Sequence, residues 1–265
     1  MSTLVRDTLA ELVSRRILIL FGVITVVMLI GVWASWEVRE SLTLPSGEAP
    51  PEPAGGTLVQ TRTTAAIAFV MSIYLFFVVI ASCGLIPRAL EKGRAEFYLS
   101  KPFSRHRFLI GKLLSIWVVY GLLAVLCGSL VYVISILIHG GFDIRVLLLF
   151  GVSLLEFTVW LSVLGLIGVL TGSGSWAMML AFCLWVAQNL LSLHEQFGQI
   201  VANKAIAYTV DAFYYVLPKT GQMGEIGANL ASGRPIESWL PLWSSLLFAT
   251  VVGYASIRVF ERRDY

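Results

Sequence analysis

The only Gly-Lys pair in the sequence, Gly111-Lys112, is the one place where a phosphate-binding loop could form. Such a loop has the pattern G-x-x-x-x-G-K-[ST], because its glycines let backbone N–H groups approach the phosphates and its hydroxyl holds Mg²⁺. Here His106 replaces the first glycine and Leu113 replaces the hydroxyl residue. We therefore expect the chain to bind no cofactor of its own, so that any energy from ATP-Mg must come from a partner chain.

The stretch HEQFG, His194–Gly198, carries half of a zinc-protease signature. The full motif is H-E-x-x-H on a helix, which brings two imidazoles to one face. Gly198 stands in place of the second histidine, and the remaining histidines, His106 and His139, are expected on opposite sides of a membrane. The sequence therefore predicts no metal site and no catalytic residue.

Glu156 is the one ionisable residue well inside an apolar segment, about ten residues or roughly 15 Å from the start of that segment. A charged acid at this depth costs at least about 2.5–3.5 kcal/mol, so it is neutral, paired or facing water. Gln188 and Asn189, in the next segment, are placed to reach toward it. Two interpretations stay open: Glu156 lines a polar pathway or an inter-subunit cavity, or it is a protonated acid that hydrogen-bonds a neighbouring helix. An enzyme that acts on lipid through Glu156 and His194 is a further alternative, for which few polar residues converge at one depth.

The elements that position these residues are apolar segments of membrane-spanning length. Of the residues, 57% are hydrophobic and 13% are charged, whereas about 25% are charged in soluble domains. A helix that rises about 1.5 Å per residue needs about 20 apolar residues to cross a hydrocarbon core of about 30 Å. We predict an all-α integral membrane protein, a single transmembrane domain over residues 1–265, with six transmembrane helices. They are Ile17–Trp36, Thr64–Ile86, Leu113–Ile138, Val146–Leu170, Trp176–Leu193 and Trp239–Phe260.

The distribution of basic residues predicts the orientation of these helices. Thirteen of the 19 Lys and Arg residues fall on the side that holds the N-terminus, and basic residues concentrate on the cytoplasmic side of membrane proteins. Both termini are therefore predicted to be cytoplasmic, in a plasma (inner) membrane of the bacterial type. The net charge of +3 is then an orientation signal, so the lipid bilayer is the expected partner of the basic residues and no nucleic acid is expected.

Two further segments are expected at the membrane surfaces. Residues 3–16 separate apolar from charged side chains and predict an amphipathic helix in the cytoplasmic interface, with a disordered N-terminus as the alternative. Residues 194–238 contain several tyrosines that suit the headgroup level, and they predict one or two short helices that end near Pro218 and lie at or dip into the outer interface. A solvated cap is the alternative for this segment. Small residues in GLIGVLTG, Gly165–Gly172, suit close helix approach.

The densest charge in the chain lies between the second and third spans, over residues 87–111. A short amphipathic helix that stops before Pro102 is predicted there, followed by Ser104 as the N-cap of the next helix. One interpretation is that these charges only set the orientation. Because two or three basic residues are enough for that, the mixed acids and bases favour a surface that docks another protein. The residues assigned to it are Arg88, Glu91, Lys92, Gly93, Arg94, Glu96, Lys101, Pro102, Arg105 and Arg107.

The sequence LEKGRAEFYLSKPFSRHRFLIGK, Leu90–Lys112, resembles the first cytoplasmic loop of type 2 ABC transporter permeases. The matching positions are Glu91, Gly93, Leu99, Pro102, Arg105, Gly111 and Lys112, whereas Arg94 stands where the family often has Thr. The resemblance implies a permease that pairs with a second copy or a sister permease and with two cytoplasmic ATPase subunits, which bind ATP-Mg. The loop is then the coupling helix that transmits nucleotide-driven motion.

The function expected from these features is transport of an unidentified substrate by alternating access. Residues 87–111 are expected to provide the coupling, residues 3–16 leverage at the interface, and residues 194–238 the outer gate. A non-transporting membrane scaffold or signalling subunit has the same topology and stays an alternative.

Overall fold

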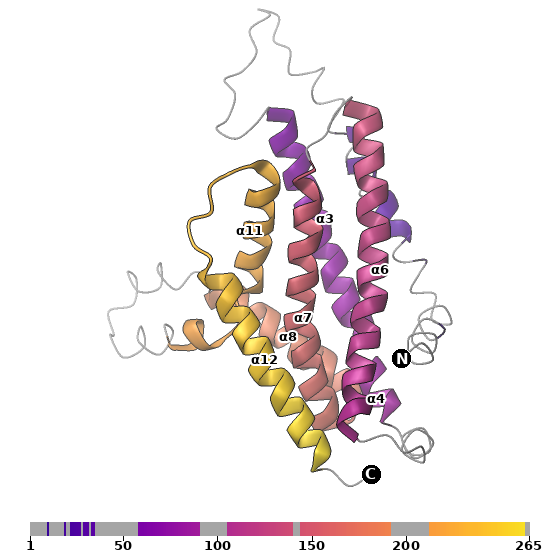
Figure 1. The fold of residues 1–265 in the computed structure, drawn as a ribbon, viewed down its shortest axis with the longest axis vertical. Helices are drawn as coiled ribbons and strands as arrows, with labels where there is room; N and C mark the ends of the chain where they lie inside the picture. The colour runs from indigo at the N-terminus through magenta and orange to yellow at the C-terminus, as the bar shows by residue number, and fades with distance from the viewer. Residues whose placement is uncertain are drawn as a thin grey trace, which may run out of the picture.

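The computed structural model describes residues 58–90, 105–139, 144–191 and 212–262, together with scattered positions from 10 to 34. The elements in that part of the chain are all helices, which confirms the all-α prediction. In chain order they are α3 (Leu58–Ser82), α4 (Leu85–Ala89), α6 (Arg105–His139), α7 (Val146–Thr171), α8 (Gly174–Leu191), α11 (Thr220–Ser232) and α12 (Leu240–Glu261), as Figure 1 shows. A further short helical turn covers residues 212–216.

Five stretches of the described chain are long and apolar enough to cross a membrane, which marks this as a membrane protein. They are Ile67–Ala89, which runs from α3 through α4, His106–Ile134, Val146–Thr171, Gly174–Leu191 and Leu240–Glu261. For the remaining predicted span, Ile17–Trp36 near the N-terminus, a shorter apolar helix covers Gly22–Gly31. The count of six and the cytoplasmic termini stay predictions, and the helix predicted over residues 3–16 lies, but for one position, outside the described residues.

Helix α7 is the centre of the bundle and contacts α3, α4, α6, α8, α11 and α12. Its sequence is apolar on every side, as expected for a helix inside a membrane-spanning bundle. The ring of Phe157 is fully buried, and its centroid lies 4.2 Å from that of Tyr120 on α6. The close approach predicted for Gly165–Gly172 is confirmed at Gly168, where a Cβ would lie 3.1 Å from Cγ2 of Ile86 on α4.

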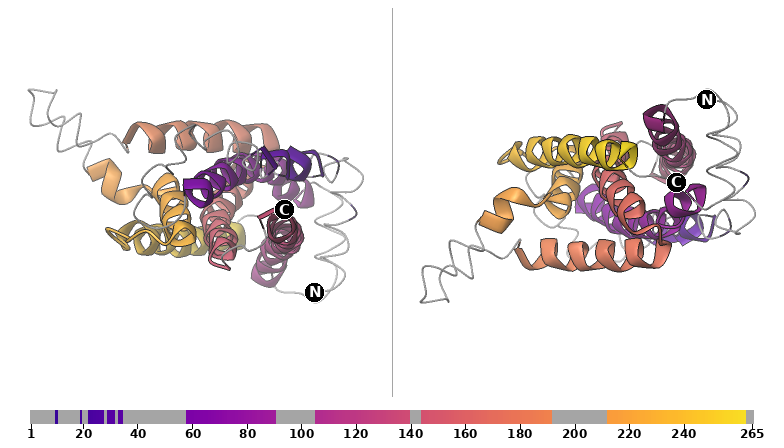
Figure 2. Two further views of the ribbon diagram at one scale, coloured as in Figure 1. Left: turned by 90° about the horizontal axis from the view of Figure 1, so that it is seen from above. Right: turned by 90° about the horizontal axis from the view of Figure 1, so that it is seen from below.

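A tight turn joins α7 to α8. Gly172 ends α7 with φ 63°, a left-handed conformation that glycine adopts without a steric cost, and its N–H donates to the carbonyl of Gly168 at 3.0 Å. Helix α8 starts two residues later at Gly174, where a Cβ would lie 3.1 Å from Cα of Gly84. The first turn of α8 is therefore seated against the α3–α4 junction. From there α8 runs along the edge of the bundle, where Figure 2 shows it lengthwise.

Helix α6 is longer than the predicted span Leu113–Ile138, because it begins at the helix start that the sequence predicted after Ser104. Its 35 residues extend about 50 Å, more than the roughly 30 Å of a hydrocarbon core. It begins at Arg105, directly after Ser104, so the last part of the predicted loop 87–111 is continuous with the span. The reason is burial: Phe108 is buried in this first part of α6, and its ring centroid lies 6.4 Å from that of Phe260 on α12. Residues 91–104, which connect α4 to α6 and include the short helix predicted before Pro102, lie outside the described part.

The segment between α8 and α12 departs most from the sequence prediction. The short helix over residues 212–216 ends next to Pro218, as predicted, but a longer helix that was not predicted, α11, begins just after Pro218. It packs against α7, α3 and α12. Met223 is fully buried, and a Cβ on Gly227 would lie 3.3 Å from Cβ of Val152. Figure 1 shows α11 beside α3 and α7, far from α4, so this helix belongs to the packed bundle rather than to its periphery.

Candidate functional site

A cavity of about 530 Å³ lies between α3, α7, α8 and the first residues of α11. Its wall is mostly apolar, with large rings from Phe76 on α3, Trp160 on α7, and Phe182 and Trp185 on α8. Hydroxyl, carboxyl and amide groups reach it from Ser72, Glu156, Asn189 and Thr220. A concave, apolar surface with a few polar groups is the usual character of a ligand site. This cavity is therefore the candidate functional site.

Glu156 lies on the part of α7 that faces both the cavity and α11. Its Oε2 lies 4.0 Å from the point that a Cβ on Gly224 would occupy, so the glycine leaves room for the carboxyl. With Ser153 and Gly227 it also lines a small space of about 20 Å³ between α7 and α11. None of the hydrogen bonds or ion pairs between described residues includes this carboxyl. A carboxyl so placed needs water or a ligand as its partner.

The two amides predicted to reach toward Glu156 are engaged elsewhere. The hydroxyl of Thr220, at the start of α11, donates to Oε1 of Gln188. Nδ2 of Asn189 donates to the carbonyl of Trp185 at 2.8 Å, within α8 itself. The structure thus brings Asn189 to the same cavity as Glu156, and it places Gln188 against α11 instead. For Gln188 the reason is that the first residues of α11 lie against the end of α8 and supply a closer partner.

Sequence reasoning missed Thr220 and the helix that carries it. A signal was present, because Pro218 ends the preceding turn and Gly233 follows the last residue of α11 with φ 69°. Proline before a helix and glycine after it are typical boundaries. The polar composition of the segment TGQMGEIGANLAS concealed that it would be buried.

Lys219 is a second residue whose role the sequence did not reveal. Its backbone N–H donates to Oγ of Ser245 at 2.8 Å, and its ammonium donates to Oγ of Ser244 at 3.4 Å. The ammonium also lies 4.5 Å from the ring centroid of Tyr214 and 5.5 Å from that of Tyr215. Burial lowers the pKa of this lysine. These contacts direct its charge toward the tyrosines and α12, at the wall of a second, polar pocket of about 260 Å³.

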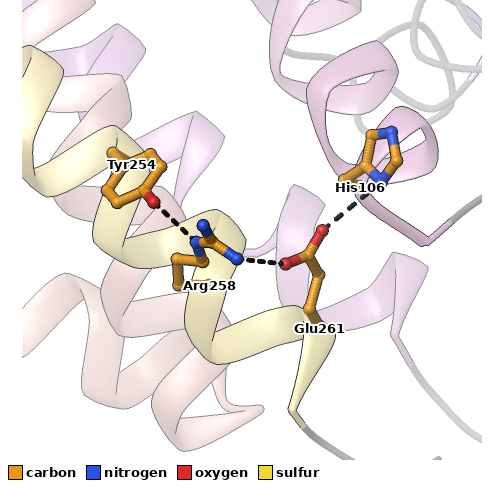
Figure 3. Close-up of polar contacts among 4 residues, drawn as sticks. All are labelled: His106, Tyr254, Arg258 and Glu261. Atoms are coloured by element: carbon orange, nitrogen blue, oxygen red, sulfur yellow. Dashed lines mark hydrogen bonds and ion pairs between the residues drawn. The ribbon is translucent and has the colours of Figure 1, made fainter.

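The opposite end of the bundle carries a chain of exposed polar contacts, shown in Figure 3. Nε of Arg258 donates to the hydroxyl of Tyr254 at 2.7 Å, and Nη1 lies 3.6 Å from Oε2 of Glu261. The other carboxyl oxygen of Glu261 lies 3.4 Å from Nδ1 of His106. The contacts join the end of α12 to the start of α6. Both ends of the connection between α4 and α6 are therefore at this end of the molecule.

The residues assigned to the docking surface lie at this same end where the structure describes them. Arg88 on α4 and Arg107 on α6 are exposed, and Arg105 is the first residue of α6. The others lie outside the described residues: Glu91, Lys92, Gly93, Arg94, Glu96, Lys101 and Pro102. Lys112, which belongs to the resemblance, is buried within the second turn of α6.

A short route of close contacts links this charged end to the cavity. Ile86 and Pro87 of α4 pack against Gly168 near the end of α7. A Cβ added at Gly168 would lie 3.1 Å from Cγ2 of Ile86 and 3.3 Å from Cδ of Pro87. Gly84 is in contact with Gly174 at the start of α8. The α7–α8 hairpin held in this way supplies Glu156, Trp160, Phe182 and Trp185 to the cavity. The contacts of α4 thus reach the hairpin that forms one wall of the cavity.

Comparison with known proteins adds no relative to this picture. No protein-family model matches the chain, and no curated protein sequence matches it significantly. Within the described residues, no group of three or more His, Cys, Asp or Glu side chains is placed to hold a metal ion. The functional argument therefore depends on the geometry of the cavity and of the charged end.

Proposed function

We propose that the chain is a membrane-spanning permease subunit of an ATP-driven ABC transporter. In this function, cytoplasmic ATPase subunits dock on the segment between α4 and α6, and a second permease copy or a sister permease completes the complex. Hydrolysis takes place on the ATPase subunits, because the sequence lacks a phosphate-binding loop. The substrate moves by alternating access through a site that includes the cavity between α3, α7 and α8.

The observation that carries this proposal is the seating of α4 against the α7–α8 turn. A docking surface drives transport only if its motion reaches the substrate site. Here the chain just before the charged segment contacts the α7–α8 hairpin at two points: Gly84 lies against Gly174, and Ile86 lies against Gly168. That hairpin forms one wall of the cavity. Packed interfaces of this kind move between discrete arrangements and do not deform continuously. The arrangement supports a coupling element placed between an ATPase and a substrate cavity.

The test begins with co-purification of the chain and its associated ATPase, followed by ATP hydrolysis measured in lipid nanodiscs. We expect Glu91→Ala and Arg105→Ala to lose ATPase binding in a pull-down or to lose hydrolysis that depends on this chain. If no ATPase co-purifies, or if both variants bind and hydrolyse as the natural chain does, the proposal is wrong and the scaffold interpretation takes its place.

A second variant tests the route from the docking segment to the cavity. Gly174→Ala adds a Cβ that would lie 3.1 Å from backbone Cα of Gly84, so the α4–α8 contact must open. Overpacking of this kind costs about 1–3 kcal/mol. We expect ATPase binding to persist while coupled hydrolysis falls. The matched control is Gly151→Ala on α7, where a Cβ has nothing within 4 Å, and it should retain full hydrolysis. Equal hydrolysis in the two variants would contradict the route.

A further inference from the structure

The cavity combines one carboxyl with walls that offer it no positive charge. Among the residues that line it, all in the described part of the chain, there is no Lys, Arg or His. Lys219 is next to Thr220 in sequence, but its ammonium lies over the ring of Tyr214 and donates to Ser244. An acid in an apolar site is stabilised by a partner of opposite charge. Because no basic side chain lines the cavity, a bound ligand would have to supply the positive charge that pairs with the Glu156 carboxyl.

The rings of the cavity are suited to a cation as well as to an apolar surface. The ring centroids of Phe76 and Trp185 lie 5.8 Å apart with their planes inclined by 52°. Those of Phe182 and Trp185 lie 6.1 Å apart with an angle of 28°. These three side chains come from α3 and α8, two of the helices that line the cavity. Aromatic faces attract cations through the ring quadrupole, most strongly at tryptophan.

We infer that this cavity binds a lipophilic cation, a monovalent cation whose body is apolar or aromatic, with the Glu156 carboxylate as its counter-ion. The cation is placed toward α7, where Glu156 lies, and its apolar body lies against Phe76, Phe182 and Trp185. The volume of about 530 Å³ is within the range of about 300–1,000 Å³ that holds a drug-sized ligand. The inference deepens the proposed function, since it names the substrate class of the same cavity.

Other ligand classes match the cavity less well. An anion would meet the carboxylate of Glu156 with no basic side chain to offset it among the lining residues. A small hydrated cation would have to exchange its water for hydrocarbon and ring surfaces, which cannot replace most of its hydrogen bonds. A neutral lipid chain would fill the volume but would leave the carboxyl without a partner. This last case makes a definite counter-prediction, because neutral and cationic ligands of equal shape would then bind alike.

The test is equilibrium binding of radiolabelled methyltriphenylphosphonium to the purified full-length chain in detergent. Triphenylphosphine oxide, which has the same three rings and no charge, is the neutral competitor. We expect saturable binding, weak competition by the oxide, and a Kd that rises at least about tenfold in Glu156→Gln, which corresponds to about 1.4 kcal/mol. Glu237→Gln, a change at an exposed carboxyl before α12, is the matched control and should bind like the natural chain.

A second pair of variants tests the ring wall. Trp185→Leu should weaken binding about threefold or more, because it removes the best cation–π surface, while Trp185→Phe should stay closer to the natural chain. Trp243→Leu, on the exposed side of α12 and away from the cavity, is the control. Equal affinity for the cation and the neutral oxide in the natural chain would overturn the inference, and this comparison needs no variant that could fail to fold. No saturable binding, or an unchanged Kd in a folded Glu156→Gln protein, would overturn it as well.

The binding experiment and the ATPase experiment fail separately. Charge-selective binding that depends on Glu156, in a chain without an ATPase partner, would keep the ligand site and reject the permease function. Coupled hydrolysis without charge-selective binding would keep the permease function and reject the lipophilic-cation site.

Discussion

Helices α7 and α8 follow each other along the chain, and both are apolar enough to span a membrane, yet they differ sharply in their surroundings. In the most apolar 18-residue stretch of each helix, 61% of α7 is buried within the protein, whereas only 11% of α8 is buried. On α8 the buried side chains are Ala177, Ala181 and Gln188. The comparison teaches that α7 is the support on which the bundle is assembled, while α8 is a wall whose outer surface faces away from the protein.

The contacts of α8 explain how a wall with so little burial keeps its place. Its first turn is seated against Gly84, and its last turns are tied to α11 through the hydrogen bond from Thr220 to Gln188. The middle of the helix contributes Met178, Met179 and Phe182 to the cavity. A helix anchored near both ends and adjoining a cavity in between is suited to admitting a ligand.

The largest effect should come from removing a ring from the support helix. Phe157→Ala deletes a fully buried side chain that contacts Tyr120, and such a change costs about 3–5 kcal/mol in water-soluble proteins. In a bilayer the packing part of this cost remains, so we expect a loss of at least about 2 kcal/mol. Phe182→Ala, at a half-exposed ring on α8, should cost much less. Thermal unfolding of both purified variants measures the difference, and equal losses would remove the distinction between the two helices.

An intermediate effect is expected at the tie between α8 and α11. Thr220→Val keeps the shape of the side chain but removes the hydroxyl that donates to Gln188, whose Nε2 is already buried without a hydrogen-bond partner among the described residues. Leaving a buried amide unsatisfied costs about 1–3 kcal/mol. Thr250→Val, at an exposed position on α12, is the control. Hydrogen exchange in α8 and α11 should rise in the first variant alone. If both variants exchange alike, the tie does not hold α8 in place.

The smallest effect is expected at the exposed polar chain of Figure 3. Glu261→Gln removes the charge that faces both Arg258 and His106. Exposed ion pairs contribute little, because water and salt screen them. We expect thermal stability to remain at the natural value at low and high salt, since Phe108 and Phe260 hold the α6–α12 contact beneath the polar groups. A clear loss that disappears at high salt would show that polar contacts, and not burial, hold this end together.

The sequence predicted the spanning helices closely wherever an apolar run ended at turn residues. The fourth span was predicted as Val146–Leu170 and is Val146–Thr171 in the structure. The helix start predicted after Ser104 is confirmed at Arg105 of α6, although this start precedes the apolar run. The prediction for residues 194–238 was poorer, because it did not include a helix after Pro218. Helix α11 is polar by composition, and its burial depends on glycines such as Gly227 that let it approach α7.

The candidate site was only partly visible in the sequence. Glu156 stood out because an acid within an apolar run is costly, and the turn after Thr171 made α7 and α8 neighbours. The cavity itself had no signature, since its wall is built from the same Phe, Trp and Met side chains that elsewhere face lipid. Gln188 and Asn189 were associated with the correct region, but the partner of Gln188 depended on the position of Thr220, and Asn189 bonds within α8.

The sequence by itself determined that the chain is helical and membrane-spanning, where most of its spans begin and end, and that a single acid lies deep in one of them. These properties follow from the free energy of placing polar groups in hydrocarbon, which each residue contributes locally. Only the tertiary structure decided that α7 is central and α8 peripheral, that α11 packs among the spans, and that Glu156 opens onto a cavity. The reason is that lipid is as apolar as leucine, so a lipid-facing surface and a protein-facing surface have the same hydropathy and are distinguished only by packing.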